Sequence, residues 1–301
     1  MRFESRHIGN KRVGGGMMIR MILMGAILIL LLLLILKKGG DQKPSPSRYV
    51  RSPDRMQVVY WPAEHNQLIH YTNHTLSYNP QYKQADWVAY VLTREDLEGE
   101  ESEWLPEFLR DPDLEDVARP EDYLNTDYVM GQLLPYEDRP GSQEDKQEIF
   151  YMSNVTPQKK EFNQGVWREL EENIRDWARS SGRLYIVTGP VLNGGQGEMI
   201  GTSQVFVPEY FFKAILDIDG SEPKMIGFLI PNEGTDAPLE SFATSIDEIE
   251  SLTKIDFFKS ILLDQKLEDS LESDFDIGQW PIDPSRYQRR VERWNEIKIK
   301  E

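Results

Sequence analysis

The chain of 301 residues contains no cysteine and only four histidines. Without thiols it has no disulfide framework, no thiolate zinc site, no cysteine nucleophile and no lipid anchor on cysteine. The absence of cysteine does not identify the compartment, because a thiol-free chain is compatible with either side of a membrane. With 39% hydrophobic residues, the chain is long enough to bury one sizeable core or two small ones.

Positive charge is scarce beyond the first 55 residues. Residues 1–55 hold 11 of the 34 Lys and Arg residues and 3 of the 51 Asp and Glu residues. Residues 56–301 therefore carry 23 basic and 48 acidic residues, a balance of −25. A domain with this charge repels the DNA polyanion at long range. A local basic cluster is still present in the middle of the chain, at Lys159, Lys160, Arg168, Arg175 and Arg179.

Only one long uncharged hydrophobic run occurs, at residues 21–36, flanked by Arg20 and Lys37. We interpret residues 19–38 as a single-pass transmembrane anchor, because snorkelling of the flanking cations extends a run slightly short of a full span. A cleavable signal peptide is the alternative, although the sequence after residue 36 lacks a small-x-small cleavage pattern. The positive-inside rule does not decide the orientation, since five basic residues precede the run and six follow it.

The anchor divides the chain into segments of different composition. Residues 1–18 form a basic N-terminal segment, and residues 39–60, rich in Gly, Pro, Ser and Lys, are typical of a flexible stalk. We expect one globular domain over residues 66–270 and a C-terminal tail with a helix over 271–301.

Hydrophobic patterns predict an α+β domain, with strands interrupted by a few helices. Residues 74–78 and 87–93 predict a hairpin, and the run at 164–180 has one apolar helical face. Ser245 and Glu248 predict a capping box that opens a short helix over 246–252. Further strands are expected at 184–188, 205–207, 210–218 and 225–230, and a charged helix at 285–300.

Two other features have an ordinary and a functional interpretation. The acidic, proline-containing segment 94–122 is expected to be mostly solvated loop, and it lacks the spacing of an EF-hand. His65, His70 and His74 lie close together, and the last two share a face if the segment is extended. A metal site there is conceivable, but surface histidines at the edge of a first hairpin are the expectation.

The most informative motif is Ser153 to Gln158, followed by Phe162 to Trp167 and by Leu170-Glu171. It resembles the metal-ligand segment of the DNA/RNA non-specific endonucleases, the sugar-non-specific nucleases with a ββα-metal (His-Me finger) site. The resemblance extends over residues 69–258. It implies an α+β domain with a central antiparallel sheet, behind the N-terminal transmembrane helix. It also implies nucleic acid as the partner and a location outside the cytoplasm.

In that family a single asparagine binds one metal ion, usually Mg²⁺, and the matching residue is Asn163. The resemblance implies that Glu171 orients metal-bound water, that Arg175 contacts phosphate and that Asn154 supports the substrate site. A plainer interpretation makes Asn163 a helix cap and Glu171 with Arg175 an exposed i,i+4 pair.

The family's other half-site, an Asp-Arg-Gly-His motif, is replaced here by Val129-Met130-Gly131-Gln132. The resemblance places the general-base histidine at Gln132, whose amide does not accept a proton near neutral pH. Loss of a general base typically lowers the rate by about 10²–10⁴. Losing the arginine at Met130 removes further charge stabilisation.

Three functions remain open from the sequence. The first is a membrane-anchored domain of the nuclease family with impaired catalysis, kept for binding. The second is an active Mg²⁺-dependent endonuclease with an altered base. The third is an acidic module that binds an unidentified protein partner.

Overall fold

The structure, a computed structural model, describes residues 62, 66–98, 107–139, 143–192, 197–259, 261–262 and 264–298. The predicted basic segment, anchor and stalk (residues 1–60) lie outside these ranges, as does His65. Within them, none of the helices combines the length and apolarity that spanning a bilayer requires.

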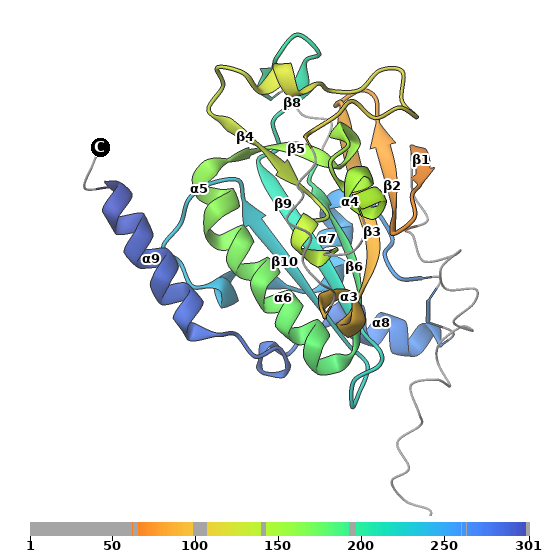
Figure 1. Cartoon of the computed structure of the whole chain (residues 1–301). Helices are drawn as coiled ribbons and strands as arrows, with labels where there is room; N and C mark the ends of the chain where they lie inside the picture. Colours follow the sequence, from red (N-terminus) through yellow and green to blue (C-terminus); the bar gives the residue numbers. More distant parts are fainter. Residues whose placement is uncertain are drawn as a thin grey trace, which may run out of the picture. The chain divides into compact units, whose positions relative to one another are not determined.

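A mixed α/β fold is organised around a seven-stranded antiparallel sheet, which confirms the expected central sheet (Figure 1). The strand order is β1-β2-β3-β6-β9-β10-β11. The bounds are β1 Gln67–His70, β2 His74–Asn79, β3 Gln84–Thr93, β6 Arg183–Pro190, β9 Tyr210–Asp217, β10 Lys224–Pro231 and β11 Ala243–Thr244. A separate hairpin-like pair is formed by β7 Met199–Ile200 and β8 Val205–Phe206.

Both faces of the central sheet are covered, because its inner strands are apolar at nearly every position. Alternate residues point to opposite faces of a strand. Ile186 and Ile215 accordingly belong to one core cluster, whereas Val187 and Ala214 belong to another. The long helix α6 packs on the first side, and α7 and α8 lie on the other (Figure 1).

A two-stranded unit followed by a helix lies over the first face. Strand β4 (Tyr128–Gln132) pairs antiparallel with β5 (Val155–Lys159). The chain continues through α5 (Lys160–Phe162), a π-helical turn (Asn163–Trp167) and α6 (Arg168–Ser181). The predicted helix at 164–180 therefore begins earlier and contains a π turn, with Gly165 in a non-helical conformation. Helix α6 ends at Gly182, whose φ of 97° favours glycine.

Shorter elements complete the domain. The remaining α-helices are α3 Arg94–Leu97, α4 Gln143–Ile149, α7 Ile246–Thr253, α8 Gln265–Ser273 and α9 Pro284–Lys298. The 3-10 turns are Pro120–Tyr123, Tyr136–Asp138, Met152–Asn154, Leu239–Phe242 and Ile277–Gln279. At the start of α7, the Ser245 side chain accepts a bond from the Glu248 N–H. The structure shows only this half of the predicted capping box.

The described part of the acidic segment, residues 94–98 and 107–122, is mostly exposed, as predicted. A minority of it is buried, with Leu114, Val117 and Ala118 in the first core cluster. Asp111 is also fully buried and accepts a hydrogen bond from the Tyr71 hydroxyl. A few apolar residues and a hydrogen-bonded carboxylate therefore attach an otherwise exposed segment to the core.

Helix α9 is joined to α6 by a buried ion pair. The Arg290 Nε donates to Glu169 Oε2 at 2.5 Å, and both residues are less than 10% exposed. The remaining guanidinium nitrogens donate to the carbonyls of Thr235 and Ala237. Because every guanidinium nitrogen has an acceptor, this helix is held in one position on the start of the α5–α6 helix.

Replacing Arg290 by methionine should lower the free energy of unfolding by about 3–5 kcal/mol, because it leaves Glu169 buried without a cation. Urea unfolding measures the change. The matched variant Arg289→Met removes an exposed arginine of the same helix and should change stability by about 0.5 kcal/mol or less. The double variant Glu169→Leu/Arg290→Met should recover most of the loss. If Arg290→Met and Arg289→Met lowered the free energy of unfolding equally, the ion pair would have no special role in stability.

Candidate active site

The ββα unit brings the two half-sites together through one glutamine. Gly131 of β4 lies against the Gln158 side chain so closely that an added Cβ would be 2.1 Å from its Cδ. Gln158 of β5 is fully buried, and its Oε1 accepts a hydrogen bond of 2.7 Å from Asn163 Nδ2. A side chain at position 131 would therefore displace the Gln158 amide from Asn163, and glycine at this position avoids the clash.

Asn163 stands at the first residue of the π-helical turn and is partly exposed. Its Nδ2 is used by Gln158, while its Oδ1 has no hydrogen-bond partner among the described residues. Single π turns inside α-helices are frequent at functional sites. An oriented amide oxygen without a hydrogen-bond partner is a suitable ligand for a hard cation.

Glu171 lies two turns further along and contacts Lys213, a buried lysine of the central strand β9. The Lys213 Nζ is 3.6 Å from Glu171 Oε1 and 4.5 Å from the centre of the Trp167 ring. Burial raises the pKa of Glu171, and the charges of Lys213 and Arg175 oppose that shift. Burial likewise lowers the pKa of Lys213. Oε1 of Glu171 is buried, and the ion pair with Lys213 is its closest polar contact.

Arg175 is oriented by a buried aspartate. Its Nη1 donates to Asp138 Oδ1 at 3.0 Å, and the Tyr90 hydroxyl donates to the other carboxylate oxygen at 2.9 Å. The Arg175 side chain is only 12% exposed. Glu171 and Arg175 thus pair with Lys213 and Asp138, which corrects the interpretation of an exposed i,i+4 pair. The charge of Arg175 is already balanced before any phosphate approaches.

Asn154 is fully buried and has no surface for a substrate in this structure. Its Oδ1 accepts from the Leu134 N–H, and its Nδ2 donates to the carbonyls of Leu134 and Ile149. Asn154 thus holds the turn after β4 against the loop before β5, and its predicted supporting role in the substrate site stays a prediction.

Gln132 occupies the position predicted for the general base. Its Nε2 donates to the Ile149 carbonyl at 3.2 Å, and its Oε1 accepts from the Tyr136 N–H at 3.3 Å. The amide is therefore bonded to the backbone on both sides. Met130, at the position of the missing arginine, packs against the core. This half of the site contains no group that takes up a proton near neutral pH.

The sequence did not identify Gln158, Asp138 or Lys213 as members of the site. Gln158 lay inside the quoted motif, but nothing in the sequence showed that it would bond Asn163. Lys213 interrupts the apolar run of β9 and is followed by Ala214 and Ile215. A lysine within a strand whose neighbours are all buried is the signal that indicates a partnered internal charge.

One of the two described histidines differs from the expectation of surface side chains. His70 is exposed, but His74 is only 4% exposed and stacks on Tyr71, with neither ring nitrogen hydrogen-bonded. Among the described residues, the one group placed to hold a metal through His, Asp or Glu ligands contains neither of them. Burial, assisted by the charge of Arg139, lowers the pKa of His74 to about 3.

Comparison with known proteins agrees with this geometry. The sequence profile of the DNA/RNA non-specific endonucleases matches residues 51–263. The chain belongs to the DNA/RNA non-specific endonuclease family. It is 30% identical over 230 residues to the mitochondrial nuclease EXOG of Xenopus laevis, covering 71% of this chain and 64% of the relative. It is 31% identical over 230 residues to a nuclease of Nostoc sp., covering 70% and 79%.

The fold is shared with a solved structure of the EndoG/EndoGI complex, which describes a mechanism of EndoG inhibition. The TM-score is 0.62 at 23% identity, over 72% of this chain and 95% of the other. The chain spans 56–64% of the length of the first four EXOG relatives. Family membership therefore rests on the matched domain, whereas the activities of the whole relatives are proposals for this chain.

Folding stability should depend on the protonation of His74. In the unfolded chain, the His74 imidazole binds a proton near its ordinary pKa of 6.5. In the folded chain, the same imidazole stays neutral down to about pH 3. Stability is therefore lost as the pH falls below 6.5. We expect His74→Phe to reduce the loss between pH 7.5 and 5.5 by about 1.4 kcal/mol in urea unfolding. The exposed control His70→Phe should follow the unmodified chain, and a His74→Phe curve parallel to it would contradict the assignment.

Proposed function

We propose that this domain is a metal-binding member of the nuclease family in which phosphodiester hydrolysis is impaired and nucleic-acid binding is retained. The observation that carries the proposal is the amide of Gln132, bonded on both sides to backbone at the position of the general base. An amide held in this way positions water or backbone but does not accept a proton from an attacking water.

The metal half of the site fits a hard cation such as Mg²⁺. Asn163 offers an unbonded amide oxygen, and Glu171 places a carboxylate two helical turns further along. When bound, Mg²⁺ stabilises negative charge on phosphate oxygens. Gln158 fixes the Asn163 amide, and Lys213 fixes the Glu171 carboxylate. These contacts support a site that orients a ligand more effectively than it activates water.

The electrostatics of the domain favour weak rather than strong nucleic-acid binding. Arg175 is neutralised by Asp138, and Lys159 lies 3.6 Å from Glu233. The balance of −25 over residues 56–301 adds long-range repulsion. Any binding of nucleic acid should therefore depend on the cation at Asn163 and on low salt. From the sequence alone, we further propose that residues 19–38 anchor the domain in a membrane, outside the cytoplasm.

An active enzyme with an altered base is the second candidate. It is favoured by the buried carboxylate of Glu171, because burial raises the pKa of this group to about 7, near that of a replacement base. The charges of Lys213 and Arg175 oppose this shift, because they stabilise the carboxylate in its charged form. The third candidate, an acidic protein-binding module, rests only on the charge balance.

Restoring the missing half-site should restore hydrolysis. We expect Val129→Asp/Met130→Arg/Gln132→His in the full-length chain to degrade plasmid and RNA at least about 10²-fold faster than the unmodified chain, with Mg²⁺ present. The matched control Val129→Asp/Met130→Arg, which keeps Gln132, should regain much less, because it still lacks the base. Equal rates for the unmodified and restored chains would refute impaired catalysis and favour the altered-base enzyme.

Metal binding at the retained half-site should depend on Asn163. Calorimetry should show that Asn163→Ala removes the Mg²⁺ heat seen with the unmodified chain, since the one unbonded amide oxygen of this site is lost. Gln164→Ala changes the neighbouring exposed side chain and should leave the heat unchanged. If both variants and the unmodified chain bind Mg²⁺ alike, the ion is bound elsewhere. If none binds, the metal half of the proposal fails.

A further inference from the structure

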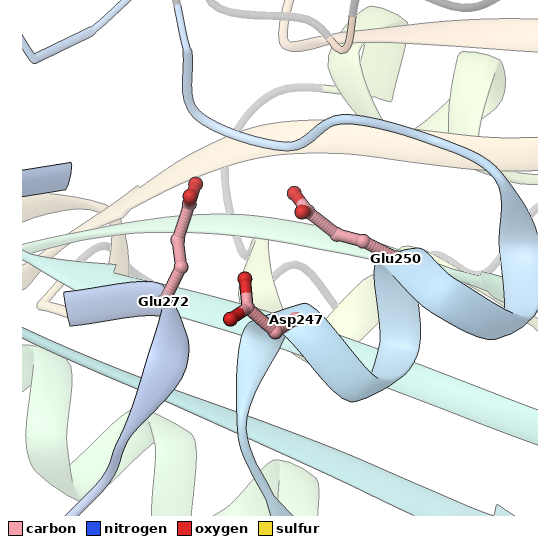
Figure 2. A group of neighbouring side chains, drawn as sticks. All are labelled: Asp247, Glu250 and Glu272. Carbon is pink, nitrogen blue, oxygen red and sulfur yellow. The ribbon is translucent and has the colours of Figure 1, made fainter. Parts of the chain in front are cut away.

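Three carboxylates converge on the face of the sheet opposite the Asn163 site. Asp247 and Glu250 belong to α7, and Glu272 belongs to α8. One carboxylate oxygen of each lies within 4.8 Å of those of the other two. Figure 2 shows the three side chains extending from the two helices toward a common space. We call these three residues the α7–α8 carboxylate cluster.

The cluster is unlike an ordinary acidic surface, because part of it is buried without partners. Glu272 is 7% exposed, and its Oε1 accepts no hydrogen bond. Figure 2 shows its carboxylate directed into the space shared with Asp247 and Glu250. Glu268, one turn earlier on α8, is 2% exposed and also has an Oε1 without a hydrogen bond. A buried ionised carboxylate is unfavourable unless a donor or a cation compensates it.

The protein groups around the cluster do not supply this compensation. Among the described residues, no ion pair shorter than 4.0 Å involves the cluster or Glu268. Lys259, whose charge acts on Glu268, is itself paired with Asp256. The backbone N–H of Phe257 donates to Glu250 at 2.7 Å, which satisfies one oxygen only.

Burial and repulsion between the carboxylates raise the pKa values of two cluster residues. Burial, followed by the neighbouring carboxylates, raises the pKa of Glu250 to about 7 and that of Glu272 to about 9. Near neutral pH the cluster is therefore satisfied either by bound protons or by a bound cation.

We propose that Asp247, Glu250 and Glu272 bind one Ca²⁺ ion. Carboxylate oxygens alone favour a hard cation over a transition metal. Ca²⁺ binds oxygens at about 2.4 Å, so two ligands on opposite sides of the ion lie about 4.8 Å apart. The observed separations do not exceed this span. Mg²⁺ binds oxygens at about 2.0–2.1 Å and usually keeps several waters with one or two carboxylates, so a group of three carboxylates favours Ca²⁺.

The proposed ion would join α7 to α8. Glu272 lies beyond residue 263, where the match to the nuclease family ends, whereas Asp247 and Glu250 lie within it. The site is thus built by a family helix together with a segment outside the match. It lies across the sheet from Asn163 and does not depend on the proposed function of that residue.

The test is Ca²⁺ binding to the full-length chain at pH 7.5, after removal of metals with a chelator, followed by calorimetry and thermal unfolding. We expect one Ca²⁺ to bind and to raise the unfolding temperature. Glu272→Gln should weaken binding by about tenfold or more, because it removes one of three ligand charges. Asn163→Ala should leave Ca²⁺ binding unchanged, which separates this site from the nuclease site.

The control variant is Glu248→Gln, which removes the same charge from an exposed position on α7. Equal weakening by Glu248→Gln and Glu272→Gln would show diffuse charge screening and overturn the proposal. The proposal would also be overturned if the unmodified chain bound no Ca²⁺ and Glu272→Gln were more stable than it. The carboxyl groups of the cluster would then be satisfied by protons and not by a cation. Mg²⁺ binding as tight as Ca²⁺ binding would overturn the assignment of the ion. If Glu272→Gln fails to fold, the exposed ligand variant Asp247→Asn provides the same comparison.

Discussion

The buried ammonium of Lys213 is the constraint on which the architecture around the site depends. A lysine in the middle of a sheet is tolerated only where its charge and its three donors are satisfied. Here the Nζ is surrounded by Glu171, the Trp167 ring, the Leu133 carbonyl and the Thr188 hydroxyl. These groups come from the long helix, the turn after β4 and the neighbouring strand. One charge therefore fixes the helix and the turn after β4 relative to the sheet, and the site is assembled around it.

The same constraint explains why the site is nearly neutral. Lys213 and Arg175 face Glu171 and Asp138, so two cations and two carboxylates compensate one another. Such internal compensation keeps the groups ordered in a region of low dielectric. It also leaves little uncompensated positive charge for a phosphate. The cation ligand Asn163 is neutral, so the charge that would attract a polyanion has to be brought by the metal.

Much of the fold was predictable, because the strands and the long helix have apolar patterns of the correct period. The strand predicted at 210–218 is observed at Tyr210–Asp217, and the position of Asn163 followed from its motif. The π turn was not predictable, since no local pattern distinguishes it from an α-helical turn at Gly165. Pairings across the fold were also missed, because the partner of Arg175 is 37 residues away in a short 3-10 turn. The burial of His74 was also missed, although one of its contacts is local: its ring stacks on Tyr71, three residues earlier in the turn between β1 and β2.

Helix α9 and the segment before it extend the folded unit beyond the region that defines the family. The match to the family ends at residue 263. Beyond it, Trp280 is buried against Trp177 of α6, and Arg290 pairs with Glu169 of the same helix. The cooperative folding unit is thus longer than the sequence signature. A fragment trimmed at the signature's edge would expose an aromatic surface and an unpaired carboxylate on α6. The C-terminal segment thus completes the surface of α6 with one indole and one guanidinium, so a stable domain has to include it.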